Sequence, residues 1–162
     1  MKLGLNLPHT YVADRYSNGP GAISVKYPID IYQCESCGHV QSLDIVPLEI
    51  LFSSDYTYKP SNNAGLRNHF KKYASILSEE LEFKPSKCLD IGSNDGTLLA
   101  AYKKKGMNVI GVEPTDIFKL SKKKNITTFN KFFDESVAKS ILKKYGYPKL
   151  IPCTNVFAHV AE

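Results

Sequence analysis

Residues 66–81 carry apolar side chains at the three- and four-residue spacing of a single helix face. The positions are Leu66, Phe70, Tyr73, Leu77 and Leu81. This spacing predicts an amphipathic helix that ends before Pro85. His69 falls off the apolar stripe, and its spacing alone favours a solvent-facing position.

Short apolar runs alternate with helical patterns from residue 87 onward. The predicted strands cover residues 88–91, 108–113, 126–129 and 149–154. Asp134 is suited to the N-cap of a helix that ends at Gly146. Pro152 cannot donate a hydrogen bond within a sheet, so the last strand is either short or bulged there. This alternation predicts an α/β fold with a Rossmann-like, doubly wound parallel sheet.

The first third of the chain lacks this alternation. Residues 1–33 contain three prolines and no sustained helical period, which predicts loops and short strands. Pro47 can open a short helix that runs to Phe52. We therefore divide the chain into an N-terminal module at residues 1–54, a linking segment with its helix at 55–85, and the sheet domain at 86–162.

The composition is that of a globular protein, with 43% hydrophobic and 23% charged residues among 162. No apolar run approaches the roughly 20 residues that span a membrane. The N-terminus lacks the basic start and the apolar core of a signal peptide. These features predict that the protein has no membrane partner and is cytoplasmic.

The formal charge of +5 comes mostly from short lysine clusters. Several clusters, such as residues 103–105, 122–124 and 143–144, fall at the ends of predicted helices, where cations complement the helix dipole. Solvated helix ends explain this pattern better than a nucleic-acid-binding stripe, so a nucleic-acid partner is disfavoured. A substrate that carries a nucleotide would also suit mild positive charge.

Two of the four cysteines form the motif Cys34-x-x-Cys37, which is followed by glycine. A tight turn of this kind places two thiolates on one ion, and it resembles one knuckle of a structural zinc site. Four ligands are needed, so only half of a zinc site is visible. Cys88 and Cys153 fall in predicted core strands and are expected to be buried small residues.

Residues 92–96 link the first predicted strand of the sheet to the next helix through two glycines. Strand, tight turn and helix start form the unit that presents backbone N–H groups to a nucleotide-like ligand. The spacing of Gly92 and Gly96 matches neither the dinucleotide fingerprint nor the phosphate-binding loop. No lysine follows Gly96, which disfavours binding of a nucleoside triphosphate.

Glu113 ends the second strand and lies 21 residues after Gly92. An acidic residue at this distance can accept hydrogen bonds from ribose hydroxyls. An ordinary strand-helix-strand turn followed by a solvent-exposed glutamate would show the same pattern. Residues 155–159 follow the fourth strand and so lie at the sheet edge where ligands bind in this class of fold.

Three motifs in order, at residues 90–96, 111–114 and 155–159, resemble class I S-adenosylmethionine-dependent methyltransferases. They are most similar to the sugar C-methyltransferases that act on nucleotide-activated deoxysugars. Upstream, the Cys34-x-x-Cys37 motif and the residues from 40 to 69 resemble that family's zinc-binding module and linking segment. The resemblance covers nearly the whole chain, and the ordered combination is more specific than the glycine motif alone.

The resemblance implies a role for each matching residue. The methionine part of the cofactor would be wrapped by Gly92, Ser93, Asn94, Asp95 and Gly96, with Asp90 shaping the turn. Glu113 would bind the ribose, with Pro114, Phe132 and Phe133 near the adenine. Asn155 would lie beside the methionine end and His159 near the reaction centre. The substrate side would be lined by Tyr56, Tyr58 and His69, and Cys34 and Cys37 would bind zinc.

The resemblance also implies a sheet of seven strands, of which this chain has room for about four. The family's later strands, its catalytic histidine segment and its first cysteine pair have no counterpart in residues 1–162. The chain is therefore expected to be an internal fragment or an incomplete gene model, with weak stability and no turnover alone. The catalytic base is expected beyond residue 162.

Other functions fit parts of the same pattern. A class I methyltransferase acting on oxygen or nitrogen would share the cofactor motifs. A zinc-stabilised module that binds nucleic acid or protein would share the cysteine turn, but aromatic residues are not interleaved with a basic stripe. A nicotinamide-dependent enzyme is disfavoured by the glycine spacing.

Overall fold

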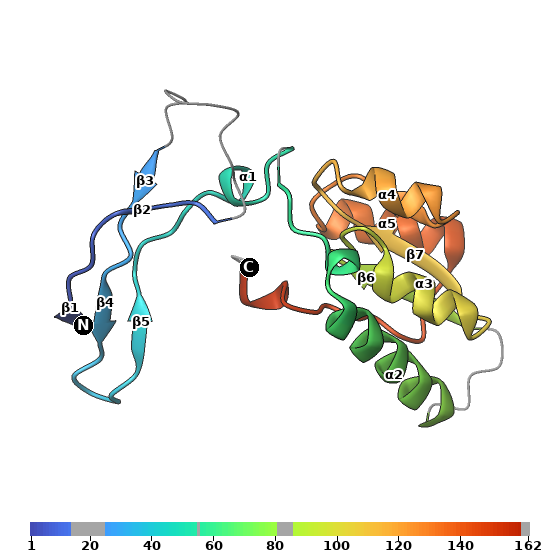
Figure 1. Cartoon of the computed structure of the whole chain (residues 1–162), viewed down its shortest axis with the longest axis horizontal. Helices are drawn as coiled ribbons and strands as arrows, with labels where there is room; N and C mark the ends of the chain where they lie inside the picture. The colour runs from blue at the N-terminus through green and yellow to red at the C-terminus, as the bar shows by residue number, and fades with distance from the viewer. Residues whose placement is uncertain (14–24, 55, 81–85, 160–162) are drawn as a thin grey trace. The chain divides into compact units, whose positions relative to one another are not determined.

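The computed structural model describes residues 1–13, 25–54, 56–80 and 86–159. The chain divides into two compact units, Met1–Ser53 and Ser54–Glu162 (Figure 1). The helix of the linking segment belongs to the second unit, where it packs against the first helix of the sheet domain.

The first unit is built from short antiparallel strands. β1 (Lys2–Leu5), β4 (Ile31–Gln33) and β5 (Val40–Ser42) form one sheet, while β2 (Thr10–Tyr11) pairs with β3 (Lys26–Tyr27). Helix α1 (Leu48–Leu51) follows Pro47 at its N-cap. The predicted short strands and the proline-initiated helix are both confirmed.

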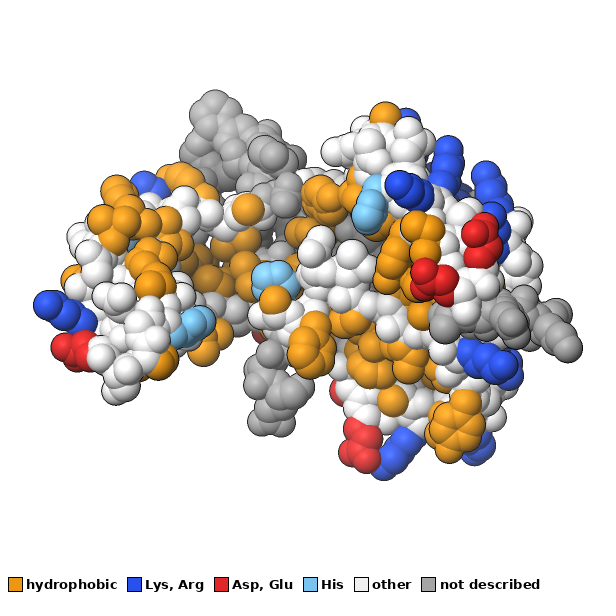
Figure 2. Space-filling view, turned by 90° about the horizontal axis from the view of Figure 1, so that it is seen from below, with side chains coloured by type: hydrophobic (Ala, Val, Ile, Leu, Met, Phe, Trp, Pro, Cys, Tyr) orange, Lys and Arg blue, Asp and Glu red, His pale blue; other side chains and the backbone are white. Residues whose placement is uncertain are grey.

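The first unit has no buried core among its described residues. Every one of them is exposed or half-buried, and large apolar side chains such as Leu5, Val40 and Ile45 face solvent. Hydrophobic side chains accordingly spread over the face of this unit that is visible in Figure 2. Sheets this small remove little apolar surface from water to set against the entropy of folding.

The second unit contains a parallel sheet in the order β6 (Lys87–Ile91), β7 (Asn108–Val112) and β8 (Thr127–Phe129). Residues 149–152 lie along the other edge of β6, where the backbone N–H of Leu89 donates to Leu150 at 2.9 Å. Ile91 donates to the Pro152 carbonyl at 3.0 Å. Proline therefore takes part only as an acceptor, and the fourth strand is reduced to a single bridge.

Helices cover both faces of this sheet. The helical segments of this unit are η1 (Pro60–Asn62), α2 (Ala64–Glu80), α3 (Thr97–Lys104), α4 (Phe118–Lys123), α5 (Glu135–Tyr145) and η2 (Phe157–His159). One buried cluster joins α2 and α3 to one sheet face, and a second joins α5 to the other. The predicted doubly wound architecture is confirmed for this part of the chain.

Helix α2 buries a slightly different stripe from the predicted one. Phe70 and Ala74 are buried, whereas Tyr73 lies at the rim with 36% of its surface exposed. The small Ala74 side chain lets α2 approach α3 closely, so the innermost position falls one residue later than the pattern predicted. Leu81 lies outside the described residues.

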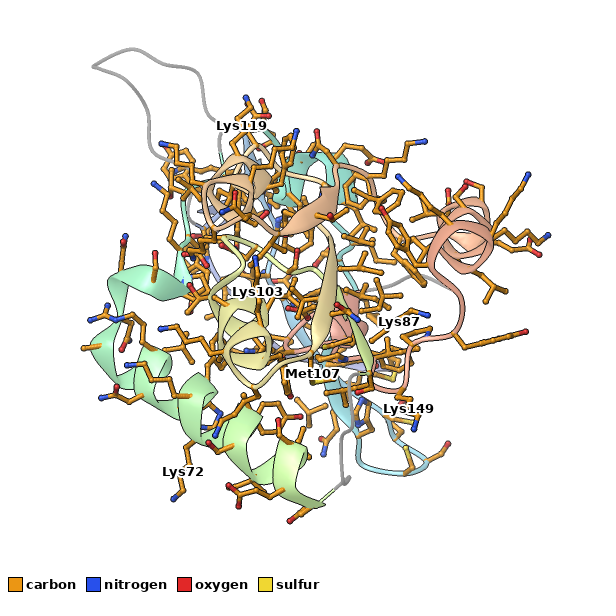
Figure 3. The ribbon with its side chains drawn as sticks, turned by 90° about the vertical axis from the view of Figure 1, so that its right-hand side faces the viewer. Lys72, Lys87, Lys103, Met107, Lys119 and Lys149 are labelled. Carbon is orange, nitrogen blue, oxygen red and sulfur yellow. The ribbon has the colours of Figure 1, made fainter. Side chains whose placement is uncertain are left out.

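The lysine clusters lie at helix ends, as predicted. Lys103 and Lys104 end α3, Lys122 and Lys123 end α4, and all four are exposed. Figure 3 shows Lys72 and Lys119 pointing away from the fold. Within the described ranges, no helix is both long and apolar enough to cross a membrane.

We expect Leu99→Ala to lower the free energy of unfolding by about 2–5 kcal/mol, because Leu99 is fully buried between α3 and its neighbours. The matched control is Leu142→Ala on α5, where the side chain is 37% exposed and the loss should be clearly smaller. Urea denaturation of both variants measures the difference. Equal losses would contradict the packing of α3 described here.

Candidate ligand site at the carboxyl edge of the sheet

The sheet reverses its direction of winding at β6. The chain adds β7 and then β8 on one side of β6. It then returns through helix α5, and residues 149–152 pair with the other side of β6. At such a switch point the loops at the carboxyl ends diverge and leave a crevice where ligands bind. The glycine turn (residues 92–96) and residues 155–159 both follow strands at this point.

Gly92 is required by both backbone shape and space. Its φ is +71°, and a Cβ built there would lie only 2.3 Å from the Val156 Cγ2 atom. The segment after the fourth strand therefore packs directly on the glycine turn. This contact joins the first and last of the three sequence motifs in space.

The backbone N–H groups of the glycine turn all donate hydrogen bonds within the protein. Gly92 and Ser93 donate to the Val112 carbonyl at 2.9 and 3.0 Å. The next four donors are also engaged: Asn94 to Glu113, Asp95 to the Asn94 side chain, Gly96 to Ser93, and Thr97 to Asp95. The expectation that these groups are free for a ligand is therefore wrong. Since the turn offers no ring of donors to an anion, it does not resemble a phosphate-binding loop.

The Glu113 carboxylate is buried, with 5% of the residue exposed, and it is held in one orientation. One oxygen, Oε1, accepts from both the backbone N–H and the hydroxyl of Thr115, at 2.9 and 2.6 Å. Oε2 accepts from the backbone N–H of Asn94 at 2.9 Å. A carboxylate oxygen has two acceptor positions, so among the described residues Oε2 has one position that no donor fills. The alternative of a solvent-exposed glutamate is excluded.

Two supporting residues were not recognised in the sequence. Thr115 is 1% exposed and fixes the Glu113 carboxylate. The Asn130 side chain, from the loop after β8, donates to the carbonyls of residues 113, 114 and 115. The Glu-Pro-Thr order offers a weak sequence signal for Thr115, because a hydroxyl two residues after a carboxylate can donate a hydrogen bond to that carboxylate. Asn130 lies 17 residues from Glu113, and only the fold brings them together.

Asp90 is buried at the end of β6, with 3% exposed, and has no side-chain hydrogen bond within the described part of the chain. Burial, with a smaller contribution from the nearby Glu113 carboxylate, raises the pKa of Asp90 to about 8. The side chain is therefore mostly protonated at neutral pH and can donate a hydrogen bond. Its predicted role in shaping the turn stays a prediction.

The other predicted cofactor residues surround this edge. The Pro114 carbonyl accepts from Asn130 at 2.8 Å. Phe133 packs against the α5 cluster, whereas Phe132 is 38% exposed. Asn155 is exposed with φ of 56°, and the backbone N–H of His159 donates to the Val156 carbonyl at 2.9 Å. Their contacts with a cofactor stay predictions.

The predicted substrate-side residues belong to two segments of the second unit. Tyr58 is 44% exposed, and its carbonyl accepts from the Asn94 side chain at 3.0 Å. Tyr56 is half-buried. His69 is exposed on α2 and stacks on Tyr73 with ring centroids 6.1 Å apart, so its solvent-facing position is confirmed.

The cysteine motif forms the loop of the β4–β5 hairpin in the first unit. The backbone N–H of Cys34 donates to the His39 carbonyl at 2.8 Å, and the Cys34 carbonyl accepts from the backbone N–H of Gly38 at 2.9 Å. Hydrogen bonds from the backbone N–H groups of Cys37 and then Ser36 lower the pKa of the Cys34 thiol. In the ranges that the structure covers, no third histidine, cysteine or carboxylate joins the pair. Of the other cysteines, Cys88 is buried as predicted, while Cys153 is only half-buried.

The parallel α/β sheet of the second unit fits the Rossmann-like fold of a methyltransferase domain. The sequence profile of the family described as "Methyltransferase domain" matches residues 66–162, and the chain belongs to this family. Among curated proteins, C-methyltransferase NovU from Streptomyces niveus is 22% identical over 138 residues, which are 84% of this chain and 33% of NovU. The chain thus spans about a third of the length of this relative.

We expect Gly92→Ala to destabilise the chain more than Gly106→Ala. Both glycines have positive φ, +71° and +84°, but a Cβ at Gly106 meets nothing within 4 Å. Gly106→Ala therefore reports backbone strain alone, about 1–2 kcal/mol. The contact with Val156 should add about 1–3 kcal/mol at Gly92. Thermal or urea unfolding measures the difference, and equal losses would contradict the packing of Val156 on the turn.

We expect Asp90→Asn to change how stability depends on pH. Because the pKa of Asp90 is raised in the folded state, its stabilising protonated form is lost as pH rises. Between pH 5 and 8 the parent should lose up to about 1.4 kcal/mol per pH unit relative to Asp90→Asn. Urea denaturation at pH 5, 6.5 and 8 measures the difference in unfolding free energy between the parent and Asp90→Asn. A difference that is the same at all three pH values would contradict the raised pKa of Asp90.

Proposed function

We propose that this chain is the cofactor-binding part of an S-adenosylmethionine-dependent methyltransferase that methylates a carbon of a nucleotide-activated keto-deoxysugar. The methyltransferase family supports the reaction class. The similarity to a protein named a C-methyltransferase supports carbon as the acceptor atom. The sugar is inferred from the resemblance of the combined motifs.

The observation that carries the cofactor assignment is the buried Glu113 carboxylate with one acceptor position left on Oε2. A nucleoside ribose presents hydroxyl donors that match this acceptor. A glycine turn whose backbone N–H groups are already hydrogen-bonded fits the same ligand, because S-adenosylmethionine carries no phosphate that would need free N–H groups. Gly92 lets Val156 of the 155–159 segment pack directly against the turn.

S-adenosylmethionine supplies an electrophilic methyl group when bound. The protein must then align a nucleophilic carbon with that group and exclude water. For a 4-keto sugar, a base removes the proton next to the carbonyl and hydrogen bonds stabilise the enolate. His159 lies in η2, which follows the fourth strand. We assign it to the reaction centre without assigning it the role of base.

We further propose that Cys34 and Cys37 supply two of the four ligands of a structural zinc ion. The lowered pKa of Cys34 favours the thiolate that zinc binds. The lack of a buried core in the described part of the first unit gives a metal a stabilising role. Two thiolates do not complete a tetrahedral set, so the remaining ligands must come from other groups. A cytoplasmic location stays a prediction.

The test is S-adenosylmethionine binding by calorimetry with the chain and its Glu113→Gln variant. Glutamine keeps the shape but presents an amide donor beside Asn94 or Thr115, so affinity should fall about tenfold to hundredfold. Glu135→Gln is the matched control, because Glu135 is on α5 with its side chain 82% exposed. Its affinity should equal that of the parent.

A parent chain that is folded by circular dichroism but does not bind would contradict the cofactor assignment for this chain. Binding that Glu113→Gln leaves unchanged would remove Glu113 from the site. The acceptor is tested separately by titrating a nucleotide-activated 4-keto-deoxysugar into the cofactor-loaded chain. S-adenosylmethionine binding without binding of this sugar would favour a different acceptor.

A further inference from the structure

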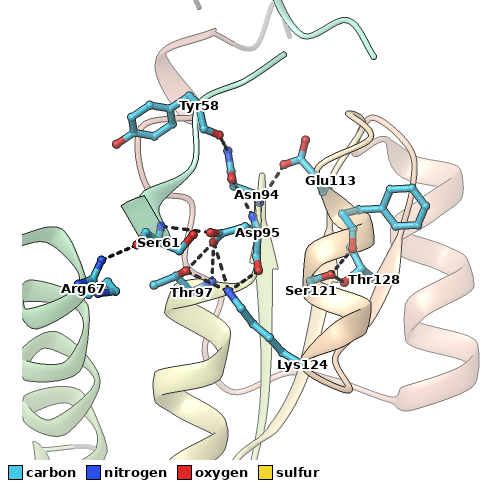
Figure 4. A network of polar contacts seen from close by, with 11 residues as sticks. Tyr58, Ser61, Arg67, Asn94, Asp95, Thr97, Glu113, Ser121, Lys124 and Thr128 are labelled. Carbon is cyan, nitrogen blue, oxygen red and sulfur yellow. Dashed lines mark hydrogen bonds and ion pairs between the residues drawn. The ribbon is translucent and has the colours of Figure 1, made fainter. Parts of the chain in front are cut away.

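Two neighbouring side chains of the glycine turn hold a segment that lies more than 30 residues earlier in the chain. The Asn94 side-chain amide donates to the Tyr58 carbonyl at 3.0 Å. The Asp95 carboxylate accepts from the backbone N–H of Ser61 at 3.1 Å through Oδ2 (Figure 4). The carbonyl of Ser61 accepts from the Arg67 guanidinium. Residues 56–62, which carry the two substrate-side tyrosines, are therefore fixed to the turn.

The role of Asp95 is to hold neighbouring groups. Its side chain is fully buried, and Oδ1 accepts from the backbone N–H and the hydroxyl of Thr97 at 3.0 and 2.6 Å. Both carboxylate oxygens are thus occupied by protein donors. Burial by itself would raise the pKa of Asp95, but hydrogen bonds from Ser61 and Thr97, together with the Lys124 ammonium, lower it. The buried carboxylate therefore stays charged at neutral pH.

Lys124 provides the positive charge for this carboxylate. Its Nζ donates to the Asp95 carbonyl at 2.7 Å and to the Thr97 hydroxyl at 3.1 Å, and lies 3.6 Å from Asp95 Oδ1. The Lys124 side chain is 33% exposed, whereas Lys123 beside it is exposed and makes no side-chain hydrogen bond or ion pair in the described part of the chain. One lysine of the 122–124 cluster is thus turned inward (Figure 4).

We propose that Lys124 is a positioning residue: it holds Asp95, and through Asp95 it fastens residues 56–62 to the glycine turn. Because one carboxylate joins both parts, a ligand that fixes the turn also fixes Tyr56 and Tyr58. By the reciprocity of coupled sites, order in residues 56–62 then tightens binding at the turn. This coupling rests on the proposed binding of S-adenosylmethionine at the turn. The fastening itself does not.

The fastening is tested in the ligand-free chain by amide hydrogen exchange of Ser61, followed by NMR. Lys124→Met keeps the apolar stem and removes the charge, so Asp95 loses its cation and Ser61 should exchange about tenfold faster. Lys123→Met is the matched control and should exchange like the parent. Urea denaturation of the same samples separates local opening from a general loss of stability. Unchanged Ser61 exchange in Lys124→Met would overturn the proposal.

The coupling is tested by adding S-adenosylhomocysteine, which has the same nucleoside and amino acid parts without the transferable methyl group. It should slow Ser61 exchange in the parent, and this extra protection should be lost in Lys124→Met and restored in Lys124→Arg. The coupling would be overturned if S-adenosylhomocysteine slowed Ser61 exchange as much in Lys124→Met as in the parent. If the parent binds no ligand, the coupling fails with the proposed function, and exchange in the ligand-free chain still decides whether Lys124 holds residues 56–62.

Discussion

The buried carboxylate of Glu113 is the constraint on which the site depends. A charged group removed from water must receive hydrogen bonds, and Glu113 receives them from the glycine turn and from Thr115. These bonds tie the carboxyl end of β7 to the loop that follows β6. The pairing of β6 with β7 sets how far apart the two loops lie. Strand register thereby determines where the remaining acceptor position of Oε2 points.

Asp95, the residue after Asn94 in the turn, is a second buried carboxylate that is held by hydrogen bonds. Its buried carboxylate accepts hydrogen bonds from Ser61 and Thr97 and forms an ion pair with Lys124, so its partners come from three separate parts of the chain. Removing any one of them leaves a buried carboxylate partly unpaired, which costs more than the lost contact itself. The backbone N–H groups of residues 92–97 are consequently all engaged within the protein. The ligand that we propose would therefore be recognised by shape and by single acceptors, in contrast to the ligands of phosphate-binding loops.

The two units show different ways of holding a fold together. The second unit buries apolar residues on both faces of its parallel sheet. The described residues of the first unit bury none, and the turn at Cys34 is closed by two backbone hydrogen bonds. The zinc ion that we propose at this turn would supply stability in addition to the few apolar contacts of the described residues.

Local patterns determined much of this protein. Apolar spacing was enough for α2, α3 and the parallel strands, and glycine spacing with Glu113 marked the carboxyl edge, because each signal lies within about 20 residues. Pro152 also indicated that the fourth strand would be either short or bulged. Other features depended on contacts between distant segments. Sequence could not show which lysine of residues 122–124 turns inward, that Ser61 meets Asp95, or that the turn's N–H groups are already occupied. Those choices are set by how α4 and residues 56–62 pack on the turn, since only tertiary packing decides which polar groups lose water and must find partners.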